Sequence, residues 1–147
     1  MNSTVNLIFT VVGAALVLLS AYGALKRDRW LFLSGFCFYS FLPIIGEYMA
    51  RHADKAQIHL LMIVLFVVQF LLTFPDKNTY ARDNKPAMAA VIKIGLAVLV
   101  INAAAALFVF HLNKQVPLQF GYYHVAFIVI MLYVQAKGVI GTASWAK

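Results

Sequence analysis

The chain has 147 residues, of which 63% are hydrophobic and only 12% are charged. Soluble domains contain about 45–50% apolar and about 25% charged residues, so this composition excludes a water-soluble globular domain. The net charge of +7 comes from Lys and Arg residues that stand singly or in short clusters between apolar stretches. This distribution indicates contact with lipid headgroups and excludes nucleic acid as a partner.

Five apolar stretches fill almost the whole chain. They cover residues 5–25, 30–49, 56–74, 87–112 and 120–140. Each is close to the roughly 20 residues that cross a bilayer core as a helix. The sequence therefore predicts an all-α fold, a polytopic membrane bundle of five transmembrane helices in a single domain over residues 1–147, with no soluble domain. Because the connecting loops are short, consecutive helices should be antiparallel neighbours.

The first stretch has one feature of a secretory signal peptide, because it is N-terminal and ends in small residues, among them Ser20, Gly23 and Ala24. The segment before it, residues 1–4, carries no Lys or Arg, whereas a signal peptide begins with a positive region. Its apolar run also exceeds the roughly 7–15 residues of a signal peptide. We therefore expect it to be retained as the first helix. Cleavage would leave four spans.

The second stretch contains Pro43 and Glu47, the only acidic residue within any predicted span. Proline removes a backbone donor and frees the carbonyl of Tyr39, so a kink is expected. Ser40, Pro43 and Glu47 are spaced i, i+3, i+7 and share one helix face, which should point into the bundle. Glu47 has two possible roles. It either meets headgroup water and pairs with Arg51, or it is a ligand or a carrier of protons.

The same stretch holds the lone cysteine of the chain, Cys37. A single cysteine excludes an intrachain disulfide and any CxxC redox or zinc motif. Its position near the middle of an apolar helix suppresses the thiolate, so a packing role is expected.

The third and fourth stretches each contain an amide side chain well inside the apolar run, Gln69 and Asn102. Amide side chains within spans commonly hydrogen-bond between helices, and we expect these two to pair. Gly95 and the alanines at 103–106 surround Asn102 and would allow a neighbouring helix to approach closely. A pore-lining role for Asn102 is the alternative.

Lys and Arg are unevenly distributed over the alternate loops. If the N-terminus lies outside, the inner side receives eight of them and the outer side three. The inner set is Lys26, Arg27, Arg29, Lys77, Arg82, Lys85, Lys137 and Lys147, and the outer set is Arg51, Lys55 and Lys114. Short loops rich in Lys and Arg stay on the cytoplasmic side, so the five spans should run N-out, C-in. Lys93, one to two turns inside the fourth stretch, can extend to the same inner interface.

Under this topology, the four histidines and Glu47 all lie in the outer part of the membrane. His59, His111 and His124 belong to three different helices, while His52 lies in a loop and is the expected bystander. Imidazole and carboxylate ligands suit zinc, copper and iron, and paired imidazoles suit haem. The set therefore predicts a possible site for a transition metal or haem, with Glu47 as an additional metal ligand. The alternative is that these histidines only meet water and headgroups at the interface.

No catalytic motif is present, because the sequence lacks HExxH, a phosphate-binding loop and paired acids at diagnostic spacing. An enzyme is therefore not expected. The favoured function is a non-catalytic subunit or scaffold, in contact with lipids and with other membrane chains or copies of itself. The second hypothesis is a redox or transport protein that binds metal or haem at the outer histidines. The third is a proton-coupled carrier of small solutes. The loop charges fit a bacterial inner membrane, the favoured location, and would fit an organelle membrane equally well.

Overall fold

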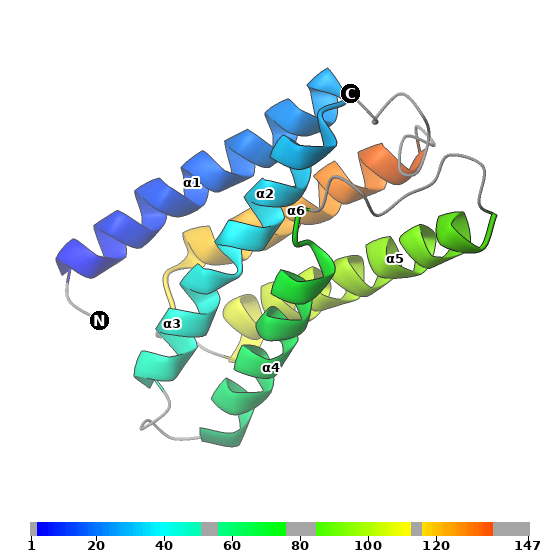
Figure 1. Ribbon diagram of the computed structural model, residues 1–147. Helices are drawn as coiled ribbons and strands as arrows, with labels where there is room; N and C mark the ends of the chain where they lie inside the picture. The colour runs from blue at the N-terminus through cyan, green and yellow to red at the C-terminus, as the bar shows by residue number, and fades with distance from the viewer. Residues whose placement is uncertain (1–2, 51–55, 76–84, 113–115, 137–147) are drawn as a thin grey trace.

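The computed structural model describes residues 3–50, 56–75, 85–112 and 116–136, and within these ranges it is helical and contains no strand. The prediction of an all-α fold is therefore confirmed. Figure 1 shows the helices in chain order. They are α1 (Ser3–Lys26), α2 (Arg29–Tyr39), α3 (Phe41–Ala50), α4 (Ala56–Leu72), α5 (Lys85–Leu107), the π-helical turn η1 (Phe108–Leu112) and α6 (Leu118–Ala136).

Four helical segments are long and apolar enough to cross a membrane. They are Ser3–Lys26, Arg29–Ala50, Ile94–Leu112 and Leu118–Ala136. The third apolar stretch forms α4, which is apolar but has only 17 residues. At about 1.5 Å per residue, α4 is about 26 Å long, slightly less than the roughly 30 Å of a bilayer core. The length criterion therefore supports four of the five predicted spans.

A tight turn joins α1 to α2. Arg27 adopts a left-handed conformation with φ of 57°, and the amide of Asp28 donates to the carbonyl of Gly23 at 2.8 Å. This is the geometry with which a helix commonly ends. The Asp28 side chain then accepts from the amide of Leu31 at 3.1 Å and caps α2. The backbone hydrogen-bonding groups at the end of α1 and at the start of α2 find partners within a few residues, so α1 and α2 form an antiparallel hairpin.

Small residues allow α1 and α2 to pack closely. A Cβ atom on Gly23 would lie 2.3 Å from the backbone nitrogen of Phe32, and one on Gly35 would lie 2.5 Å from Cβ of Ser20. The Ser20 hydroxyl donates to the Phe32 carbonyl at 3.0 Å. Ser20 and Gly23 are among the small residues that gave the first stretch its likeness to a signal peptide. In the structure they form a helix-packing contact.

The second apolar stretch is interrupted between α2 and α3. The amide of Ser40 is shared between the carbonyls of Phe36 and Cys37, both at 3.2 Å, and the Ser40 hydroxyl also donates to Phe36 at 2.9 Å. Pro43, which has no amide hydrogen to continue the ladder, follows three residues later. The expected disturbance of this helix is therefore present. Cys37 is buried with 1% of its surface exposed, in agreement with a packing role.

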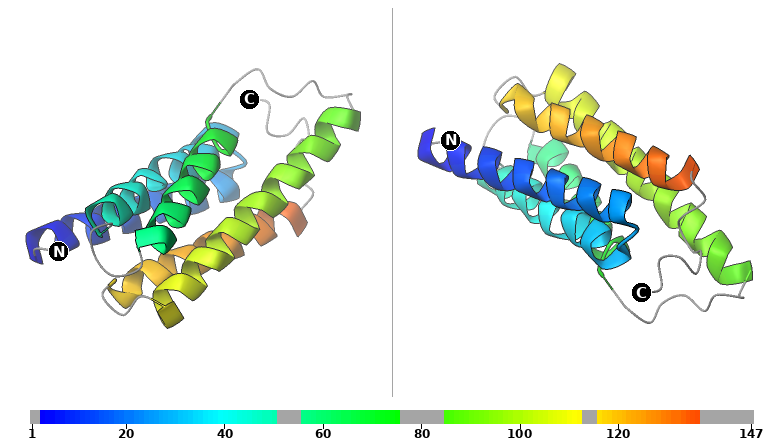
Figure 2. Two further views of the ribbon diagram at one scale, coloured as in Figure 1. Left: turned by 90° about the horizontal axis from the view of Figure 1, so that it is seen from below. Right: turned by 90° about the horizontal axis from the view of Figure 1, so that it is seen from above.

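The helices run alternately in opposite directions (Figure 1). Helix α1 packs against α2 and α6, α3 packs against α4, and α5 packs against α4 and α6. Figure 2 shows the α1–α2 pair and the α5–α6 pair lying side by side, with α4 beside α3. Two apolar clusters fill the interior, one around Phe36, Tyr39 and Phe127 and the other around Phe66 and Phe108.

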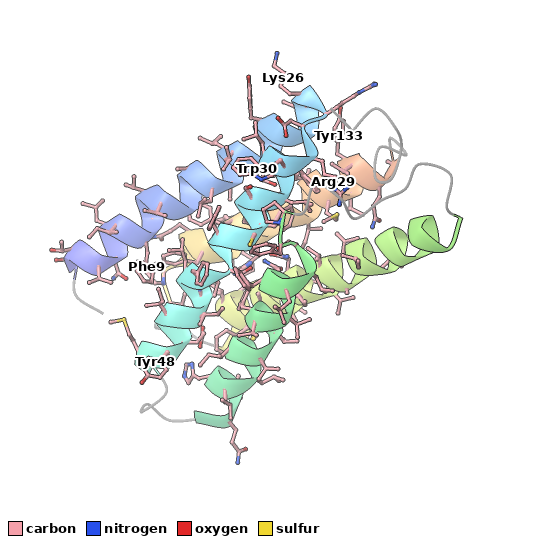
Figure 3. The ribbon with its side chains drawn as sticks, in the orientation of Figure 1. Phe9, Lys26, Arg29, Trp30, Tyr48 and Tyr133 are labelled. Atoms are coloured by element: carbon pink, nitrogen blue, oxygen red, sulfur yellow. The ribbon has the colours of Figure 1, made fainter. Side chains whose placement is uncertain are left out.

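Described residues of the predicted inner set lie at one end of the bundle, and the predicted outer set lies outside the described residues. Lys26, Arg29 and Trp30 lie where α1 ends and α2 begins, and Tyr48 lies near the opposite end, on α3 (Figure 3). Lys85 begins α5 at the same end as Lys26 (Figure 1). The described residues of the predicted inner set thus gather at one end of the bundle.

Candidate functional site

The structure separates the histidines that the sequence places at one depth. His59 on α4 and His124 on α6 are buried, with 6% and 3% of their surfaces exposed. His111, in η1, is exposed. His52 and Arg51 lie outside the described residues. Two of the predicted site histidines therefore face the interior of the bundle, and one does not.

Glu47 also faces the interior, and it is paired with His59. Its carboxylate is hydrogen-bonded to Nδ1 of His59, which joins α3 to α4 across 12 residues of sequence. Glu47 is 8% exposed, and the ring of Phe108 meets the His59 ring edge-on at 5.9 Å. A buried carboxylate and imidazole at this contact share a proton, either as an ion pair or as a neutral pair. Burial and the His59 contact favour an internal role for Glu47 over contact with headgroup water.

A chain of hydrogen bonds links α2, α4, α5 and α6 through four buried side chains. Gln69 donates to the hydroxyl of Ser40 at 3.1 Å. Asn102 donates to the amide oxygen of Gln69 at 2.7 Å and to the carbonyl of Val98 at 2.9 Å. Nδ1 of His124 lies 3.0 Å from the amide oxygen of Asn102. The expected interhelical bond between Asn102 and Gln69 is thus one link of a longer chain.

The direction of these bonds determines the tautomer of His124. The amide nitrogen of Asn102 donates to Gln69 and Val98, so its oxygen is the atom that faces His124. An amide oxygen only accepts, and Nδ1 of His124 must therefore carry the hydrogen. In the neutral imidazole, Nε2 is then left as an acceptor. Within the described part of the chain, the structure gives Nε2 no hydrogen-bond partner.

A cavity of about 130 Å³ lies between these polar groups. It is bounded by the start of α1, the end of α3, the middle of α4, the end of α5 with η1, and the start of α6 (Figure 1). Glu47 and His124 both line it, and we call it the Glu47–His124 cavity. Asn6 of α1 lines it too, and its side-chain oxygen is buried without a hydrogen-bond partner. The cavity lies toward the end of the bundle opposite Lys26 and Arg29.

Aromatic rings form part of the remaining wall of the cavity. Phe66 stacks on the His124 ring at 5.4 Å, and Tyr39 meets the same ring edge-on at 5.4 Å. Phe9 reaches from α1 toward α3, where it lies 3.8 Å from the position of a Cβ atom on Gly46 (Figure 3). These rings hold His124 in place and make the cavity mainly apolar, with a few polar atoms in its wall.

The predicted four-residue metal site, Glu47, His59, His111 and His124, is not assembled. Among the described residues, no group of three or more His, Cys, Asp or Glu side chains is placed to hold a metal ion. The physical reason is that Glu47 and His59 bind each other, Asn102 holds His124, and His111 is exposed. The cavity is also far smaller than a haem group.

Three residues of the site escaped the sequence analysis in their actual roles. Asn6 can be singled out from the sequence, because polar residues inside apolar stretches are rare and commonly functional. The sequence predicts that Ser40 shares a helix face with Glu47, but it does not predict the contact of Ser40 with Gln69. Tyr39 carries no such signal, because aromatic residues are common in membrane helices.

No family model, curated protein or solved structure matches this chain. Its function therefore has to be argued from the geometry of the site.

Proposed function

We propose that this chain is a multi-pass membrane protein that binds a small ligand in the Glu47–His124 cavity. The observation that carries the proposal is that a buried carboxylate and a buried imidazole belong to residues that line one mainly apolar cavity. Leaving a buried acceptor without a donor costs about 1–3 kcal/mol. Water in the cavity can satisfy the polar atoms of its wall, and a ligand with matching groups would replace that water.

The second part of the proposal is the orientation of the bundle. The cavity lies at the end opposite the basic residues Lys26 and Arg29, and short basic loops face the cytoplasm. This supports an N-out, C-in orientation, in which the cavity faces the outer side of a bacterial inner membrane. A ligand would then enter from outside the cell.

Labelling of engineered cysteines measures this orientation. In a Cys37→Ala background, Thr4→Cys should react with a membrane-impermeant maleimide on intact cells. Lys26→Cys should react only after the membrane is permeabilised. Both positions are exposed at opposite ends of α1, so they form a matched pair. The reverse labelling pattern would contradict the N-out orientation.

A cavity-filling variant tests ligand binding itself. Gly46 lines the cavity, and a leucine there would occupy the space that a ligand needs without removing a polar group. Gly46→Ala is the matched control, because an added Cβ meets only Phe9, at 3.8 Å. We expect a small probe such as 1-butanol to bind saturably to the wild type and Gly46→Ala in lipid nanodiscs, and at least about tenfold more weakly to Gly46→Leu.

The side chain of Met62 provides the readout. Met62 lines the cavity, whereas Met131 belongs to the other apolar cluster, so a ligand in the cavity should shift the NMR signal of the Met62 methyl group and not that of Met131. Equal, non-saturating shifts of both methyl groups would indicate probe dissolved in lipid. That result would contradict the proposed function.

The subunit or scaffold role expected from the sequence remains a separate proposal. Its support is the wide apolar face of α1, where Leu7, Val11, Leu18 and Leu25 are each at least 60% exposed. Lipid covers such a face equally well. A second chain that co-purifies in fixed stoichiometry and protects this face from lipid-phase labelling would favour the subunit role.

A further inference from the structure

The polar atoms of the cavity are suited to a ligand that donates hydrogen bonds. Nε2 of His124 is an acceptor, because Asn102 holds the hydrogen on Nδ1. Glu47 contributes a carboxylate of which one oxygen, Oε2, contacts His59, and the other has no partner within the described residues. Two residues with acceptors, Glu47 of α3 and His124 of α6, therefore line the same cavity.

The aromatic wall adds a preference for positive charge. Phe9, Phe66, Phe108 and Phe120 line the cavity together with Tyr39. The face of an aromatic ring attracts a cation, most strongly where water is excluded. A primary ammonium group has three N–H donors and one positive charge, and thus matches both the acceptors and the rings.

The Glu47–His59 pair can supply the compensating negative charge. While the two side chains share a proton, the pair has no net charge, whether the proton lies on Nδ1 of His59 or on Glu47. If the proton leaves, the pair carries one negative charge on the Glu47 carboxylate. A cation in the cavity would favour this deprotonated state, because an unpaired charge in an apolar site is strongly unfavourable.

We infer that the Glu47–His124 cavity takes a small primary amine as its ammonium ion, in exchange for the proton shared by Glu47 and His59. This inference rests on the proposed function and specifies its substrate class. One positive charge enters as the ammonium ion, and one leaves as the proton that passes from the pair to water. The carboxylate of Glu47 then accepts from the ammonium group, and neutral His59 remains beside it.

The other titratable groups around the cavity are compatible with this exchange. Tyr39 comes from α2 and His124 from α6, and His124 keeps its single hydrogen on Nδ1 toward Asn102. The described residues that α1, α5 and η1 contribute to the wall are Asn6, Phe9, Ala105, Phe108 and Val109, which carry no charge. Among the described wall residues, Glu47, which is paired with His59, is therefore the group through which the proton is released.

The volume of the cavity limits the size of the amine. A cavity of about 150 Å³ accommodates benzene, which has six heavy atoms, and the present cavity is about 130 Å³. An amine with about four carbon atoms fits this space. 1-Butylamine and 1-butanol have the same shape and differ in charge, so they form a matched pair of probes.

Binding of the two probes to the full chain in nanodiscs tests the inference. By the NMR shift of the Met62 methyl group at neutral pH, 1-butylamine should bind at least about tenfold more tightly than 1-butanol, because hydrogen bonds to charged groups are stronger. Isothermal titration in two buffers with different ionisation enthalpies should show about one proton released per amine bound. Both measurements use the wild-type chain, so neither depends on whether a variant folds.

Glu47→Gln then assigns the effect to the carboxylate. This variant should lose the preference for the amine and the proton release, and should still bind 1-butanol. If wild-type protein binds both probes equally, or binds the amine without proton release, the inference is overturned while the proposed function stands. If neither probe shifts the Met62 signal, the proposed function fails as well.

Discussion

Glu47→Leu should destabilise the bundle by about 3–5 kcal/mol, the largest effect that we expect from a single substitution in this chain. The reason is that Glu47 and His59 are both buried and bound to each other. Removing one member of a buried pair leaves the other without its partner in an apolar environment. The measurement is the free energy of unfolding in bicelles, followed by helical circular dichroism.

The double variant Glu47→Leu/His59→Leu is the control for this interpretation. Replacing both members of a buried pair with apolar residues is often neutral or stabilising. We therefore expect the double variant to be more stable than Glu47→Leu. If the losses of stability caused by Glu47→Leu and by His59→Leu simply added in the double variant, the two side chains would not be coupled. Glu47 and His59 would then contribute only through separate packing contacts.

Asn102→Leu should destabilise the fold by about 1–3 kcal/mol. The Asn102 side chain donates to Gln69 and Val98 and accepts from His124, so leucine leaves both the Gln69 oxygen and Nδ1 of His124 without partners. Hydrogen bonds between membrane helices contribute about 0.6 kcal/mol on average and at most about 1.7 kcal/mol. Loss of two such bonds gives the expected range, which the same unfolding measurement reports.

A second readout separates the role of Asn102 in positioning His124 from its role in packing. In the wild type, the ¹⁵N chemical shifts of His124 should identify the tautomer with the hydrogen on Nδ1. In Asn102→Leu, this preference should be lost. Leu99→Ala, a nearby change on α5 outside the hydrogen-bond chain, should destabilise the protein without altering the tautomer. An unchanged His124 tautomer in Asn102→Leu would contradict the assignment.

The Ser40–Gln69–Asn102–His124 chain positions side chains and does not conduct protons. Two of its four members are amides, which donate and accept but do not readily exchange a proton along a relay. The third function expected from the sequence, a proton-coupled carrier, therefore gains no proton relay from Gln69 and Asn102. Proton exchange is left to the Glu47–His59 pair, which lies beside the cavity.

Much of the fold could be predicted from the sequence, because membrane helices depend on the length and polarity of local stretches. An apolar run of about 20 residues has to satisfy its backbone hydrogen bonds internally, and a helix does so without reference to the rest of the chain. Proline at position 43 disturbs its own helix for an equally local reason. The pairing of Gln69 with Asn102 was also accessible, because two amides in neighbouring spans have few other partners.

The partners of the titratable residues depended on the tertiary structure. The position of a residue along an apolar stretch gives its depth, and periodicity gives its helix face, but neither gives the rotation of one helix against another. Glu47 could have met Arg51 or a metal ion, and the packing of α3 on α4 turns it to His59. The same rotations turn His124 to Asn102 and leave His111 exposed. The sequence by itself thus determined a bundle of apolar helices with a few polar side chains inside. Only the packing of those helices decided which polar groups bind each other and which line a cavity, because such contacts join residues far apart in the chain.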